Sequence, residues 1–89
     1  MVALHRACNK GHLECAKALL GAGADINKQS NGGRTPLMGA AWNGKIEVVR
    51  ELLKRGAKKE LKNNDGDTAY DHAHNWASSN KEEIKALLH

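Results

Sequence analysis

The chain has 89 residues, too few for two independent hydrophobic cores, so a single domain over residues 1–89 is predicted. Its net charge of +4 is too small for a polybasic tail. Residues 18–24, the longest nearly apolar stretch, are far fewer than the roughly 20 that a membrane-spanning helix needs. The apolar residues include 13 Ala and 10 Leu but no Phe, so we expect small side chains between closely approaching helices.

The chain opens without a signal-peptide pattern. Two cysteines are too few for a disulfide framework, and we expect Cys8 and Cys15 to be small buried residues in a reducing compartment. These features predict an intracellular protein, cytoplasmic or nuclear.

The sequence repeats itself with a period of 33 residues. Shifting the chain by that amount gives eight identities over the 21 positions 4–24, and it continues by aligning Thr35 with Thr68. Such a period is the signature of stacked supersecondary units. We expect three units, approximately residues 1–29, 30–62 and 63–89.

Each unit is predicted to contain two short helices and an extended finger. The first begins directly at its inner helix. In the second unit, Thr35 is expected to cap a helix near 36–43 that has Pro36 at its first position. A second helix near 46–55 is predicted from an apolar stripe at helical spacing. That stripe comprises Ile46, Val49, Leu52 and Leu53.

The second finger and the third unit depart from this pattern. Lys59 replaces Ile26, and Leu61 is expected to compensate for the lost apolar side chain. Ile84 follows Val49 by 35 residues rather than 33, which implies a two-residue insertion. A capping box is possible at Ser79 with Glu82 or at Asn80 with Glu83. We expect the third unit to be a cap whose outer side is wetted by Asp71, Lys81, Glu82, Glu83 and Lys85.

The residues Thr35-Pro36-Leu37, Ala40-Ala41, Gly44, Glu47-Val48-Val49, Leu52-Leu53 and Gly56-Ala57 resemble the ankyrin repeat almost position for position. The resemblance covers essentially the whole chain. It implies an all-α solenoid of stacked helix-turn-helix units with β-hairpin-like fingers. It also implies a non-catalytic module that binds another protein through its concave face and finger tips.

Matching the chain to the family pattern gives candidate partner-binding positions. The finger tips fall at Asn31, Gly32 and Arg34, and then at Asn64, Asp65 and Asp67. The inner-helix positions fall at Asn9 and Lys10, Trp42 and Asn43, and Asn75 and Trp76. We expect Trp42 to be the main contact, since Trp is enriched among binding hot spots, with packing as the alternative. For Trp76 the two roles are left open.

Other chemistry is less well supported. The segment His5, Cys8, His12 and Cys15 has zinc-ligand residue types, but a glycine interrupts the helix between the pairs. The resemblance to ankyrin repeats implies instead that His5 and His12 form structural hydrogen bonds between repeats. His72 and His74 are two residues apart and point to different helix faces. We therefore expect neither a metal nor a cofactor. The sequence contains neither a nucleophile elbow nor a P-loop, so no enzyme is predicted.

One helix end is basic, and we interpret it as a solvated helix terminus. An acidic partner is the sharper alternative, and nucleic acid is not favoured because interleaved aromatic residues are missing. These basic residues are Arg50, Lys54, Arg55, Lys58, Lys59 and Lys62. A second hypothesis for the whole chain is an engineered or excised ankyrin fragment whose partner is a copy of itself.

Overall fold

The computed structural model describes residues 3–76 and 80–88, and of Asn75 and Trp76 it describes the backbone only. Six helices follow one another along this part of the chain, and no strand occurs in it. They are α1 (Ala3–Lys10), α2 (Leu13–Gly21), α3 (Pro36–Trp42), α4 (Ile46–Lys54), α5 (Ala69–Trp76) and α6 (Lys81–Leu88).

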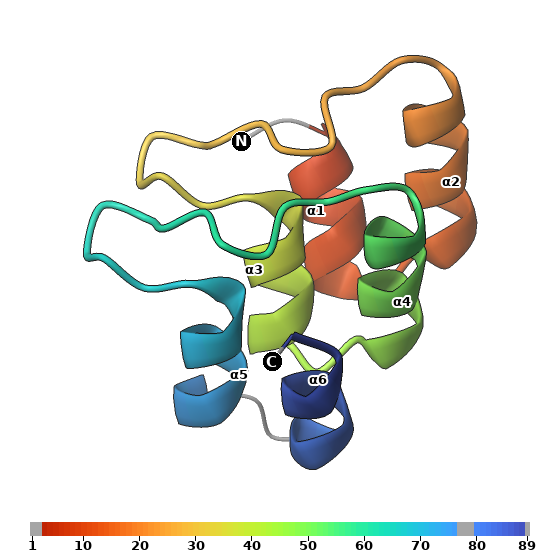
Figure 1. Ribbon diagram of the computed structural model, residues 1–89. Helices are drawn as coiled ribbons and strands as arrows, with labels where there is room; N and C mark the ends of the chain where they lie inside the picture. Colours follow the sequence, from red (N-terminus) through yellow and green to blue (C-terminus); the bar gives the residue numbers. More distant parts are fainter. Residues whose placement is uncertain (1–2, 77–79, 89) are drawn as a thin grey trace.

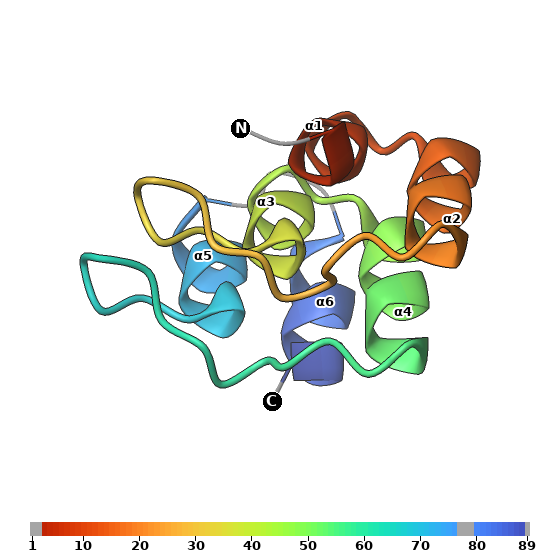
Figure 2. The same ribbon diagram turned by 90° about the horizontal axis from the view of Figure 1, so that it is seen from above.

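The helices form two rows. Helices α1, α3 and α5 pack in one row and α2, α4 and α6 in the other, and the loops after α2 and α4 project to the same side of the molecule (Figure 1). The view from above shows the same two rows (Figure 2). The predicted all-helical solenoid is therefore confirmed.

Local sequence explains where the helices begin. Thr35 caps α3 because its Oγ1 accepts a hydrogen bond from Met38 N (3.3 Å), and Pro36 occupies the first helical position. Thr68 and Asp71 cap α5 reciprocally, since Thr68 N donates to Asp71 Oδ2 (3.0 Å) and Asp71 N donates to Thr68 Oγ1 (3.3 Å). Asp71, which was expected on the wetted outer side of the third unit, is half-buried, and its carboxylate also satisfies the backbone at the start of a helix.

The helix ends lie close to their predicted positions. Helices α3 and α4 each end one residue before the expected boundary. Asn80 precedes α6 with a left-handed φ of 55°, and its Nδ2 donates to Gly44 O (3.2 Å). That side chain thus ties α6 to the turn between α3 and α4. Ser79, the other capping candidate, lies outside the described residues.

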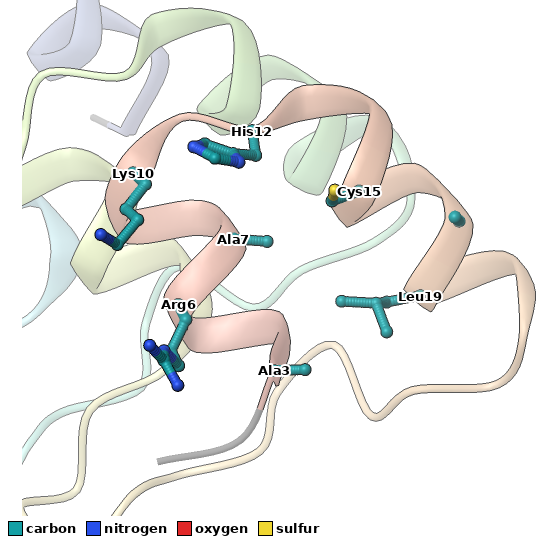
Figure 3. A pocket seen from close by; sticks show the side chains of 8 residues that line it. Ala3, Arg6, Ala7, Lys10, His12, Cys15 and Leu19 are labelled. Carbon is teal, nitrogen blue, oxygen red and sulfur yellow. The ribbon is translucent and has the colours of Figure 1, made fainter.

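Small and aliphatic side chains fill the core, as the composition predicts. Ala40, Ala41 and Ala73 are buried along the inner row, which lets those helices approach closely. Leu61 packs against this core and so compensates for Lys59, which is exposed. Cys8 is buried, but Cys15 is exposed, so its expected burial is wrong. The reason is that Cys15 lies on a side of α2 that lines an open hollow beside α1 (Figure 3).

Side-chain and backbone hydrogen bonds hold the two fingers together. Asn64 N donates to Gly32 O, and Asn64 Nδ2 donates to Asn31 O, both at 3.0 Å. Lys58 N donates to Asn27 Oδ1 (2.9 Å). Each finger also closes on itself through a tight turn, since Gly33 N donates to Ser30 O (2.8 Å) and Gly66 N donates to Asn63 O (3.0 Å).

Candidate partner-binding groove

A groove of about 260 Å³ lies between the finger tips and the inner helices. We call it the finger groove. Its floor comes from Trp42 on α3 and His72 on α5, and its walls come from the two fingers. The lining residues are Gly32, Arg34, Trp42, Asn63, Asp65, Asp67 and His72.

Trp42 lines the finger groove and is half-buried. The Arg34 guanidinium carbon lies 4.1 Å from the centroid of the indole ring, within cation–π range. On another side, the His72 ring packs edge-on, with centroids 5.2 Å apart and planes at 77°. Trp42 therefore has both a packing role and an accessible part that faces the groove.

Asn63 determines which nitrogen of His72 carries the proton. Asn63 Oδ1 accepts hydrogen bonds from Asp65 N and Asp67 N, each at 2.9 Å. These bonds fix the orientation of the amide, so that its Nδ2 is the atom nearest to His72. That Nδ2 donates to His72 Nε2 (3.4 Å), which requires an unprotonated Nε2. The neutral ring then carries its proton on Nδ1, which is buried and has no hydrogen-bond partner among the described residues.

Burial lowers the pKa of His72, and the nearby Arg34 charge lowers it further, while Asp67, Asp71 and Asp65 oppose the change. The neutral imidazole is thus the form that this environment favours. The lining of the groove combines one guanidinium, that of Arg34, with the carboxylates of Asp65 and Asp67, so the site has mixed charge around an aromatic floor.

Four of the nine predicted site residues line the finger groove, namely Arg34, Trp42, Asp65 and Asp67. Asn31 is exposed beside it, with its carbonyl bonded to Asn64. Sequence reasoning missed His72 as part of this site. The sequence offered no local signal for it, because His72 lies 30 positions after Trp42 and the two rings meet only when the units stack.

The other predicted residues lie elsewhere. Asn9 is half-buried, and a Cβ added at Gly39 would collide with its Oδ1. Lys10 is exposed on α1 and lines a different hollow. Asn43 Nδ2 donates to Gly39 O (2.9 Å), so its amide helps to end α3. The side chain of Trp76 lies outside the described part of the chain.

The histidines and cysteines of residues 5–15, which have zinc-ligand residue types, do not form a metal site in the described part of the chain. His5 is buried, and its Nε2 lies 3.0 Å from Arg34 O, which is the structural bond expected of it. His12 is exposed, so the same expectation for His12 is wrong. Within residues 3–76 and 80–88, no three His, Cys, Asp or Glu side chains are placed to hold a metal ion.

The basic helix end is partly neutralised within the chain. Arg55 Nε donates to Glu51 Oε2 (2.6 Å), and this bond lowers the pKa of Glu51. Arg50 forms ion pairs with Glu47 (3.5 Å) and with Glu83 of α6 (3.9 Å). These contacts agree with a solvated helix terminus.

Stacked helix pairs with fingers on one side define a helical repeat protein of the solenoid class. The family model described as ankyrin repeats (3 copies) matches residues 4–89, and the chain therefore belongs to the ankyrin-repeat family. No helix of the described residues has the length and apolar character required to cross a membrane.

Several proteins from other sources are similar to this chain. Human (Homo sapiens) protein phosphatase 1 regulatory subunit 27 is 41% identical over 71 residues, which cover 80% of the chain and 46% of that protein. Mouse (Mus musculus) protein phosphatase 1 regulatory subunit 12A is 40% identical over 90 aligned positions, covering 98% of the chain and 9% of that protein. Human transient receptor potential cation channel subfamily A member 1 is 43% identical over 63 residues, 71% of the chain and 6% of that protein. The chain spans less than half the length of each.

Proposed function

We propose that this chain is a non-catalytic protein–protein interaction module that binds its partner through the finger groove. The observation that carries the proposal is Trp42, which is half-buried between Arg34 and His72 and lines an open groove. Trp and Arg are the residue types most enriched among binding hot spots, because they offer large contact areas and directional bonds. Two of the relatives bear the name of regulatory subunits of a phosphatase, which agrees with a module that acts on another protein.

The chemistry of the finger groove indicates how a partner would be held. Its volume of about 260 Å³ suits one or two side chains rather than a whole helix. Arg34 offers a guanidinium to a partner carboxylate or carbonyl, while Asp65 and Asp67 offer acceptors to a partner's N–H groups. The proposal thus assigns the anchoring contact to Trp42 and the orientation of the partner to these three charged residues.

The remaining predicted positions stay part of the proposal with smaller roles. Asn31 borders the finger groove and would contact a partner that extends beyond it. Asn9, Lys10, Asn43 and Trp76 would be reached only by a partner that covers more of the inner row. We further propose an intracellular location, because both cysteines are free and Cys15 is exposed.

The test begins with affinity capture that uses the full chain as bait, in parallel with Trp42→Ala and with Lys54→Ala as the matched control. Lys54 is exposed at the end of α4, away from the finger groove. The expected result is a protein retained by the wild type and by Lys54→Ala but lost with Trp42→Ala. A titration with that purified protein then gives the affinity. Equal retention by all three baits would overturn the groove as the binding site.

Self-association, the second hypothesis from the sequence, is tested with the same preparations. Light scattering over a range of concentrations measures the mass of the wild-type chain. A mass that grows with concentration and returns to the monomer value in Trp42→Ala would favour a second copy as the occupant of the finger groove.

A further inference from the structure

The charges that line the finger groove specify the kind of side chain that a partner inserts there, and this inference rests on the proposed function. Two carboxylates, those of Asp65 and Asp67, line the groove together with one guanidinium, that of Arg34. The lining therefore has a net charge of −1, while the chain as a whole carries +4. The finger groove is thus an acidic site on a basic molecule.

His72 leaves this balance of charge unchanged. Its Nε2 accepts a hydrogen bond from Asn63 Nδ2 (3.4 Å), so that nitrogen carries no proton. The reverse orientation of the Asn63 amide is excluded, because its Oδ1 already accepts hydrogen bonds from Asp65 N and Asp67 N. The imidazole is therefore neutral, and the groove keeps its negative balance.

The chain itself leaves both finger carboxylates without an ion pair. Among the described residues, every ion pair uses a glutamate of α2, α4 or α6. The turn at the second finger tip is fixed through the N–H groups of Asp65 and Asp67, which leaves their side-chain oxygens for other donors. Asp65 is exposed and Asp67 is half-buried, so a partner can reach them. The strongest complement of such oxygens is an N–H donor that carries a positive charge.

The aromatic floor of the groove favours the same kind of ligand. The guanidinium carbon of Arg34 lies 4.1 Å from the centroid of the Trp42 ring, so the indole already accepts one cation. The face of an indole carries negative charge, which attracts Lys and Arg side chains and repels carboxylates. The indole and the two carboxylates therefore select in the same direction.

A basic side chain and an acidic one differ in how the groove receives them. An acidic side chain would be attracted by one charge of the lining and opposed by two, and the balance is reversed for a basic one. The exposed residues Lys54, Lys58 and Lys62 lie outside the groove lining and would repel a basic segment. The local charge of the groove, and not that of the whole chain, therefore decides where a basic segment binds.

We propose that the finger groove takes a Lys or Arg side chain from a segment of the partner protein. The inserted cation contacts the indole of Trp42 and is paired with Asp65 and Asp67. Arg34 opposes the cation by its charge, and its N–H groups donate to a backbone carbonyl of the same segment. The two finger carboxylates are thus the residues that determine specificity.

The experiment selects peptides on the full chain from a display library of random sequences. The same library is passed over Trp42→Ala, and peptides retained by the wild type but not by this variant are those that use the finger groove. These peptides are expected to share a Lys or an Arg. A synthetic peptide of the selected sequence is then compared with one in which Glu replaces that residue, and the replacement is expected to weaken binding roughly tenfold or more.

Matched variants of the chain assign the contact. The double variant Asp65→Asn, Asp67→Asn keeps the size of both side chains and the N–H groups that bind Asn63, and it is expected to weaken the selected peptide roughly tenfold. Glu60→Gln removes an exposed carboxylate from the same loop outside the groove lining and should bind like the wild type. Arg34→Gln keeps N–H donors but removes the opposing charge, so it should bind at least as tightly as the wild type. Thermal melts verify that each variant is folded.

Three results would overturn the inference, and they separate it from the proposed function. Groove-dependent peptides that share Asp or Glu, and that Arg34→Gln weakens, would make the inserted side chain acidic while the groove remains the binding site. A basic peptide that binds equally well to the double variant would remove Asp65 and Asp67 from the contact. A selection that returns no peptide dependent on Trp42 would overturn the proposed function, and this inference with it.

Discussion

Trp42 packs edge-on against His72, and this pair stands one period after Asn9 and Gly39, which are also in contact. The same two repeat positions thus hold a small polar contact in one unit and an aromatic one in the next. In the first case glycine leaves room for an amide, and in the second two rings meet beneath Arg34. The difference between the Asn9–Gly39 pair and the Trp42–His72 pair thus turns an ordinary contact between units into the floor of the finger groove.

Replacement of the indole should affect binding more than folding. Trp42→Ala removes a half-buried ring with two neighbours, so we expect a stability loss of about 1–2 kcal/mol and a loss of partner affinity of about 2 kcal/mol or more. Denaturant melts and a binding titration measure the two effects. Trp42→Phe, which keeps a ring over His72, serves as the control for stability. Complete unfolding by Trp42→Ala would show that the ring belongs to the core alone.

Truncation of a core side chain should reduce stability more than it reduces partner affinity. Leu52 is fully buried between the two rows, so Leu52→Ala is expected to cost about 2–5 kcal/mol of stability through lost burial and a cavity. Leu53→Ala, at a half-buried neighbouring position, is the matched control and should cost less. Urea-induced unfolding followed by circular dichroism checks both values. Equal losses at the two positions would contradict the packing described for α4.

Stability should depend on pH through His72. Its pKa is lowered in the folded chain by burial and by Arg34, so below the ordinary value of 6.5 the unfolded chain binds more protons than the folded one. The free energy of unfolding should therefore fall as pH decreases from 6.5 towards the folded pKa and stay level above 6.5. Denaturant melts at several pH values, compared with His72→Gln, measure this effect. An identical slope in that variant would assign the dependence to other groups.

The contact between the fingers requires glycine at one position. Gly33 has a φ of 82°, and a Cβ there would lie 2.8 Å from Asn64 N. Gly33→Ala should thus cost about 1–3 kcal/mol through backbone strain and displacement of the second finger. Gly32→Ala is the control, since its Cβ would meet no atom within 4 Å. Thermal melts that rank the two variants equally would argue against this close approach.

Chelation should leave the chain unchanged. His5 is engaged by Arg34 O, and burial raises the pKa of Cys8 to about 12, so the thiolate that a metal needs is disfavoured. We expect the same Tm before and after treatment with a chelator, by differential scanning calorimetry. A drop in Tm that added zinc restores would reverse this assignment.

Local rules account for what the sequence determined by itself. The period, the Thr35 cap and the apolar stripe of α4 could all be predicted, because caps and i, i+3 spacing act within a single helix. The small side chains of the core followed from composition in the same way. Repetition then implied stacking, since one unit alone cannot bury both of its helices.

Tertiary structure alone decided the contacts between units. Trp42 and His72 are 30 positions apart, and the residues between them carry no local signal of their contact. Likewise, a cysteine is equally compatible with burial and with exposure, and in the structure Cys15 is exposed in a hollow that α1 and α2 line. Which side chains meet, and which remain open to a partner, depends on how the helix pairs pack, and that information is distributed over residues distant in the chain.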